Sequence, residues 1–420
     1  MTEEKEPKPA PFPWAMSEKI AFRFCFIYFL LLIFPWPLNF LPGTTSVFEA
    51  YDELWQRIVP WVGKHLFLVD VNGRDHSKYF FIQTFSAIYM AIIGTAIWSV
   101  MDKRRENYQK LHFYFASYVR MFACFQILTY GFAKLLQSQF PYPDLEKLVE
   151  PLGNLSSMDL YWAFMGYSPA YNYFTGGLEI IAGLLLISRR TSTAGTLLYL
   201  AIMMNVVVMN FCYDIVVKIF SSELMLMGIF LITPDLHRLN DLFFHNKGAE
   251  ALDLEPVDQN IILKKMQKGL KILILGPCFL INFISGYNKA NEAHHEGPHP
   301  PLYGIYYADD FHKNRRSYEP LKTNCSRWYR LIVQYKNYAR LENMCNKKVY
   351  LRMNVDSVHK TGTMINQNDS NDIFRFNYSV HVKGHMIMWG VHNDRDTITV
   401  GFTRVNQDSF LLNKNIFRWE

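Results

Sequence analysis

The stretch AYNYFTGGLEIIAGLLLIS, residues 170–188, carries an acidic side chain, Glu179, in the middle of an apolar segment. A helix that crosses a bilayer needs about 20 mainly apolar residues, so this stretch is long enough to span a membrane. Six other stretches have comparable length and composition: 22–42, 80–100, 112–136, 194–212, 216–233 and 268–287. The sequence therefore predicts a polytopic α-helical membrane protein with about seven transmembrane helices.

The basic residues between these spans predict the orientation of the chain. The tail before the first span, the 101–111 loop and the 234–271 segment are rich in Lys and Arg, whereas the 137–169 loop has only Lys147. Cytoplasmic loops carry an excess of Lys and Arg. We therefore expect the N-terminus in the cytoplasm and residues 290–420 on the opposite side of the membrane.

Composition predicts four regions along the chain. Residues 1–20 are rich in Pro and Glu and are predicted to be disordered, and residues 21–290 form the transmembrane domain. After a linker over 291–300, short β-rich runs alternate with turn residues, so residues 301–420 are predicted to form an all-β antiparallel domain, either a sandwich or a small barrel. Asn393-Asp394-Arg395-Asp396 predicts a hairpin turn. The predicted strands are Trp328–Gln334, Val349–Asn354, Phe374–Val380, Met386–Trp389, Thr397–Phe402 and Phe410–Leu412.

Charged and amide side chains gather in the predicted spans between residues 130 and 235. Ionisable groups at membrane depth are costly, so they usually face a partner, a cavity or a pathway. On the predicted topology most of them lie in the outer half of the bilayer, with Glu179 nearer the middle. The candidate site residues are Lys134, Glu179, Asn205, Asn210, Asp214, Lys218 and Glu223.

Two interpretations of this polar cluster are open. In the first, ion pairs between helices fix the bundle. In the second, the cluster forms a pocket that binds a quinone head group, another polar lipid or a proton. Either way, Glu179 needs a partner from another helix, because its neighbouring glycines cannot satisfy a carboxylate. By depth, the candidates are Asn205 and Asn210, together with Lys134 if its side chain reaches inward. The sequence assigns no catalytic residue.

Aromatic and sulfur-containing side chains mark two further features. Trp162, Tyr167 and Tyr171 match the aromatic belt that membrane proteins place at the membrane surface. Cys325 and Cys345 lie in the predicted outer domain, where an oxidising compartment permits a disulfide without requiring one. The histidines of the linker have little preorganisation among Pro and Gly, so no metal site is predicted.

Several motifs between residues 130 and 242 occur together. They are Tyr130-Gly131-Phe132-Ala133-Lys134, Phe174-Thr175-Gly176-Gly177-Leu178-Glu179 and Asn210-Phe211-Cys212-Tyr213-Asp214, followed by Lys218. This set resembles the DoxX-like family of membrane proteins, in a longer form with extra helices and a C-terminal domain. The resemblance implies a four-helix bundle over 112–242 and a location in a bacterial cytoplasmic membrane. Some DoxX-like proteins are small subunits of a thiosulfate:quinone oxidoreductase, so the cofactor that the resemblance implies is a quinone.

Three functions are therefore open. The chain could be an accessory or scaffold subunit whose outer β-domain binds a protein partner. It could instead be a quinone-linked redox component that uses the polar cluster. A transporter of small molecules or lipids is the third, although the sequence shows no inverted repeat. The sequence leaves catalysis open. In each case membrane lipid surrounds the helices, and no nucleic-acid partner is expected.

Overall fold

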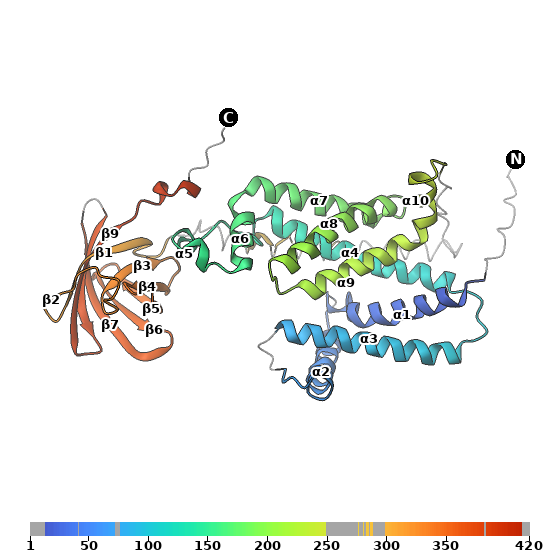
Figure 1. Cartoon of the computed structure of the whole chain (residues 1–420), viewed down its shortest axis with the longest axis horizontal. Coiled ribbons are helices and arrows are strands. Elements are labelled where there is room, and N and C mark those ends of the chain that lie inside the picture. Colours follow the sequence, from blue (N-terminus) through green and yellow to red (C-terminus); the bar gives the residue numbers. More distant parts are fainter. Residues whose placement is uncertain are drawn as a thin grey trace. The chain divides into compact units, whose positions relative to one another are not determined.

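A computed structural model describes residues 13–40, 42–71, 76–248, 299–381 and 384–413, together with Gly276, Leu280, Phe283, Ile284 and 286–288. The chain forms two compact units, one helical and one dominated by β-strands (Figure 1). The helical unit comprises Met1–Gln139 and Ala170–Asn288. The β-unit comprises Phe140–Pro169 and Lys289–Glu420.

The helical unit contains long helices of mostly apolar composition together with shorter amphipathic ones. They are α1 (Met16–Ile33), α2 (Thr45–Val62), α3 (His76–Met101), α4 (Gln109–Leu135), α7 (Pro169–Ile187), α8 (Ser192–Cys212), α9 (Lys218–Ile232) and α10 (Leu236–Phe243). Within the described residues, four segments are long and apolar enough to cross a membrane: Lys78–Met101, Pro169–Ile187, Ser192–Cys212 and Lys218–Phe243. The chain is therefore a membrane protein.

The remaining predicted spans have different outcomes. Helix α1 ends at Ile33, before the predicted end at residue 42, because Pro35 and Pro37 follow it and a proline and its preceding residue disfavour the helix. Helices α1 and α4 carry several charged residues and are not among the four segments. The seventh predicted span, 268–287, lies largely outside the described residues, as do residues 1–12 of the predicted tail and most of the 291–300 linker.

Helices α4 and α7 approach each other closely at glycines. A Cβ atom added to Gly176 would lie 2.8 Å from the carbonyl oxygen of Gly131 and 3.1 Å from the backbone nitrogen of Leu135. Further along, a Cβ on Gly183 would lie 2.6 Å from Cγ of Leu128. Small residues let membrane helices bring their backbones together in this way.

The β-unit contains an antiparallel barrel. Its strands are β1 (Gly304–Lys313), β2 (Arg316–Ser317), β3 (Trp328–Val333), β4 (Ala339–Asn343), β5 (Lys348–Asp356), β6 (Thr361–Asn366), β7 (Asp369–Val380), β8 (His385–His392) and β9 (Asp396–Arg404). Each strand from β3 to β8 pairs with the next one, β3 also pairs with β1, and β1 pairs with β9 to close the sheet. The short β2 extends β1 as a hairpin.

Large apolar side chains fill the barrel interior. Along β8, Met386 and Met388 point inward and are buried, whereas Ile387 and Trp389 alternate with them and point outward, as strand alternation requires. An eight-stranded barrel is just wide enough for side chains to fill it. The interior residues include Tyr306, Phe311, Leu331, Met353, Met364, Phe374, Phe376, Tyr378, Val400 and Phe402.

The predicted all-β antiparallel domain is confirmed, and it is a barrel. The predicted hairpin turn is also confirmed: it joins β8 to β9, and Asn393 and Asp394 both have positive φ angles, as such turns favour. The prediction of a strand over Phe410–Leu412 is wrong. Leu411–Asn413 forms a short 3₁₀ turn instead, because the closed barrel offers no free edge for another strand.

The segment between α4 and α7, residues 140–169, is part of the β-unit, and we call it the strap. It contains α5 (Leu145–Leu148) and α6 (Ser157–Tyr167). Leu145 packs with Ile305 and Ile332 in a second apolar cluster, in which all three are buried. Ile332 lies on the outer face of the barrel, so the strap covers apolar surface that the barrel alone would expose.

We expect Leu145→Ala to destabilise the β-unit by about 2–5 kcal/mol, because it removes a buried side chain from this cluster. Hydrogen exchange of the full-length protein should show faster exchange in β1 and β3. Leu152→Ala, at an exposed leucine of the same strap, is the matched control and should leave exchange unchanged. Equal effects of the two substitutions would contradict the proposed role of the strap.

Gly176→Ala should lower the thermal stability of the full-length protein in detergent, because the new methyl group would meet the backbone of α4 and separate the helices. Gly177→Ala is the control, since no atom of a neighbouring element in the described part of the chain lies within 4 Å of a Cβ at that position. Alanine is a better helix former than glycine where its methyl group has room, so Gly177→Ala should be neutral or stabilising by about 0.5–1 kcal/mol. The same melting temperature for both variants would argue against the glycine contact.

Candidate functional site

The close contact between α4 and α7 positions two charged side chains. Lys134 lies three residues after Gly131 on α4, and Glu179 lies three residues after Gly176 on α7. Residues three apart share one face of a helix. Each charged side chain therefore projects from the same face as the glycine that allows the backbones to approach.

Lys134 and Glu179 form a buried ion pair in which Lys134 Nζ donates to Glu179 Oε1. The two residues are 7% and 3% exposed, so the pair is almost completely removed from the surface of the protein. The other carboxylate oxygen, Glu179 Oε2, is buried and has no hydrogen-bond partner among the residues that the structure describes. Removing one member of a buried pair commonly costs about 3–5 kcal/mol, because the other charge is left unpaired.

Lys134, rather than an asparagine of α8, is thus the partner of Glu179. Asn210 is buried and donates to Ser221 Oγ of α9 at 2.9 Å. The side chain of Asn205 is exposed. Five residues of helix rotate a side chain by about 140° from its starting direction, so Asn205 and Asn210 cannot face the same neighbour. Depth in the membrane suggested both asparagines, but Asn205 is exposed and Asn210 bonds to α9 instead.

The other predicted site residues make separate contacts. Glu223 of α9 is buried and accepts a hydrogen bond from Thr84 Oγ1 of α3 at 2.5 Å. Asp214 and Lys218 form an ion pair at the start of α9, where the side chain of Asp214 is mostly exposed. Such exposed pairs stabilise little. The described contacts therefore divide the predicted cluster into several groups.

A second polar network, around Arg23, was not predicted from the sequence. Arg23 is 2% exposed and donates to Tyr108 Oη at 2.9 Å, to Ser99 Oγ at 2.8 Å and to the Asp102 carbonyl oxygen at 2.9 Å. Tyr108 in turn donates to the Asp102 carboxylate at 2.8 Å. The sequence did contain a signal for this network, because Arg23 lies inside the first predicted span and a charge in an apolar segment needs partners.

The β-unit has its own buried ion pairs, between the strap and the barrel. Arg340 of β4 is 4% exposed, and its Nη1 lies 3.1 Å from Glu146 and 3.6 Å from Glu150 of the strap. Lys348 of β5 lies 2.6 Å from Glu150, and Tyr338 donates to Glu146 at 2.9 Å. These contacts align the strap with three neighbouring parts of the barrel.

The two strap carboxyls differ in their pKa values. Burial raises the pKa of Glu146 above its ordinary value, although the charge of Arg340 opposes this effect. Burial alone would also raise the pKa of Glu150. Hydrogen bonds from Lys348 and Asn154 nevertheless hold the pKa of Glu150 below its ordinary value. Glu150 is therefore the more firmly ionised partner in this network.

The predicted belt aromatics lie in both units, and the two predicted cysteines lie in the β-unit. Trp162 and Tyr167 lie on α6 of the strap, where the Trp162 ring packs against Phe140 at 5.1 Å, whereas Tyr171 lies on α7 of the helical unit. The structure joins Cys325 to Cys345 by a disulfide with the two Cα atoms 5.1 Å apart. This bond ties together the chain just before β3 and just after β4.

Comparisons with known proteins give one relative. No known protein-family model matches the chain, and no solved structure matches it. A protein of Bacillus subtilis (strain 168), described as uncharacterized protein YwoB, is 31% identical to the chain over 148 residues. The alignment covers 35% of the chain and 87% of that protein. The chain therefore belongs to the same protein family as YwoB.

Proposed function

We propose that the chain is a non-catalytic membrane scaffold, an accessory subunit whose β-barrel binds a partner protein. The observation that carries this proposal is a row of apolar side chains on the outside of the barrel. Ile387, Trp389 and Val391 point outward from β8 and are 40%, 41% and 39% exposed. We call these three residues the β8 stripe.

The surroundings of the β8 stripe favour a protein partner. Trp389 lies opposite Asn377 of β7 and Thr399 of β9, so polar side chains flank the centre of the stripe on both sides. An apolar centre with a polar rim is typical of protein–protein interfaces. Tryptophan is also among the residues that contribute most to binding energy at such interfaces.

The polar groups of the helical unit support a structural role. Lys134 and Glu179 neutralise each other between α4 and α7, and Glu223 accepts the hydrogen bond of Thr84 between α9 and α3. Polar groups that pair across membrane helices in this way hold the helices together. The resemblance to the DoxX-like family is consistent with an accessory subunit.

The proposed location is a bacterial cytoplasmic membrane, with the N-terminus in the cytoplasm and the barrel on the outer side. The excess of Lys and Arg in the 101–111 and 234–271 segments supports this orientation. The bond between Cys325 and Cys345 supports it independently, because disulfides persist in oxidising compartments outside the cytoplasm.

Substituting the stripe should release the partner. We expect Trp389→Ser to reduce, by about tenfold or more, the amount of partner protein that co-purifies from native membranes, since central interface tryptophans often contribute 2 kcal/mol or more. Val358→Ser is the control: Val358 is 84% exposed, does not belong to the stripe and should retain the partner. Undiminished recovery with Trp389→Ser would refute the proposed surface.

A second candidate function, a quinone-linked redox role, is favoured by one specific observation. Glu179 Oε2 is buried and has no hydrogen-bond partner in the described part of the chain. A hydroxyl group of a reduced quinone could donate to this oxygen. The Glu179 carboxylate would then hold the quinone ring, while Lys134 neutralises the charge of that carboxylate.

A double substitution distinguishes the two functions. Lys134→Met with Glu179→Leu removes the whole pair and leaves no unpaired charge, so the protein should remain about as stable as the wild type. The single Glu179→Leu should be less stable by about 3–5 kcal/mol, because Lys134 stays charged and buried. Under the scaffold function the folded double variant retains the partner. Loss of quinone-dependent electron transfer in that folded variant would instead support the redox role.

A further inference from the structure

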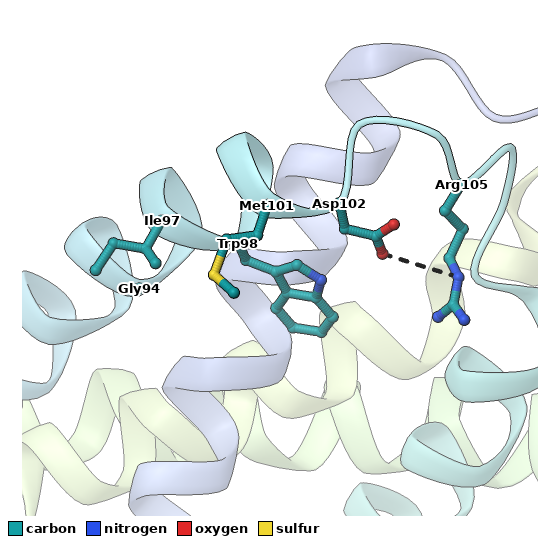
Figure 2. A pocket seen from close by; sticks show the side chains of 6 residues that line it. All are labelled: Gly94, Ile97, Trp98, Met101, Asp102 and Arg105. Atoms are coloured by element: carbon teal, nitrogen blue, oxygen red, sulfur yellow. Dashed lines mark ion pairs between the residues drawn. The ribbon is translucent and has the colours of Figure 1, made fainter.

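A shallow depression of about 550 Å³ lies at the end of α3. It is lined by Gly94, Ile97, Trp98, Met101, Asp102 and Arg105 (Figure 2). The candidate membrane span Lys78–Met101 ends within this lining. The depression is therefore placed where a membrane helix leaves the bilayer, with apolar side chains on one part of its wall and charged ones on the other.

The apolar part of the wall suits an acyl chain. Ile97 and Met101 are 55% and 81% exposed, so the protein leaves both side chains uncovered. Trp98 is held in place between them and the bundle by edge-to-face contacts with Phe26 at 5.5 Å and Tyr108 at 5.6 Å. In a membrane span, apolar side chains that the protein leaves uncovered face lipid.

The charged part of the wall is held by buried neighbours. Arg105 lies over the ring of Tyr108, with 5.3 Å between the guanidinium carbon and the ring centre, and its Nε is 3.8 Å from Asp102. Tyr108 is itself fixed by the buried Arg23. The side chain of Arg105 is 54% exposed, and its two terminal nitrogens point away from the Asp102 carboxylate (Figure 2).

The charge of the surrounding loop favours an anion. Residues 101–111 contain four basic side chains, Lys103, Arg104, Arg105 and Lys110, against two acidic ones, Asp102 and Glu106. The Asp102 carboxylate already accepts the hydrogen bond of Tyr108, and its backbone carbonyl accepts one from Arg23. The loop therefore carries a formal net charge of +2.

We infer that this depression binds one anionic glycerophospholipid. The terminal nitrogens of Arg105 would bind the phosphate as a fork, which is the geometry that makes arginine well suited to phosphate. Lys103 and Arg104 add attraction for a head group of net negative charge. One acyl chain lies along Ile97, Trp98 and Met101. This inference concerns the helical unit alone and does not depend on the proposed scaffold function.

Native mass spectrometry of the full-length protein in detergent tests the inference. The protein is titrated with phosphatidylglycerol or phosphatidylcholine of the same acyl chains, and the first bound lipid is counted. We expect the anionic lipid to bind at lower concentration. Arg105→Gln should weaken binding of phosphatidylglycerol by about fivefold, since one basic residue near a membrane surface contributes about that factor. The same substitution should weaken the binding of phosphatidylcholine by a smaller factor.

Two further variants separate a built site from general attraction. Ile97→Trp, at an exposed position, should reduce the binding of both lipids by filling the apolar wall while leaving the charges in place. Arg57→Gln removes one exposed charge from α2, far along the sequence from the depression, and should change nothing. Melting temperatures near that of the wild type confirm folding. Equal affinity for the two lipids, an unchanged affinity in Ile97→Trp, or equal effects of Arg57→Gln and Arg105→Gln would each overturn the inference.

Discussion

The contact between Gly131 and Gly176 is the constraint that sets how α4 packs against α7 and, through it, the buried ion pair of the helical unit. Without side chains at these two positions, the backbones of α4 and α7 meet, and a methyl group on either one would meet the other helix's carbonyl oxygen at 3.0 Å or less. That spacing brings Lys134 within reach of Glu179. The buried charges in turn penalise any rotation of one helix against the other, because rotation would leave both unpaired.

The β-unit uses the same physical principle between a loop and a sheet. Arg340 is buried on the outer face of the barrel, which is acceptable only because the strap supplies Glu146 and Glu150. Leu145 adds apolar contact beside these ions. In both units a buried cation therefore selects the neighbouring segment, and small or apolar residues allow that segment to come close enough.

Hydropathy and alternation predicted the four apolar membrane segments, the turn at Asn393 and the strands β3, β5, β7, β8 and β9, because these features depend on local sequence. The need of Glu179 for a partner on another helix was also predictable, since no residue beside it could supply one. The identity of that partner depends on how far each helix is rotated, which spacing alone does not give. Barrel closure was not predictable in the same way, because it depends on pairing between the distant strands β1 and β9. The place of the strap aromatics was not predictable either, because such residues suit a membrane surface as well as a protein surface.

The strap also sets a problem of timing during synthesis. Glu146 and Arg340 are separated by 194 positions. A ribosome that adds 5–20 residues each second needs roughly 10–40 s to cover that distance. During this interval Leu145 and the two strap glutamates have left the ribosome, while the strands that will cover them do not yet exist. The newly made chain must therefore keep an apolar, acidic loop soluble until the barrel closes upon it.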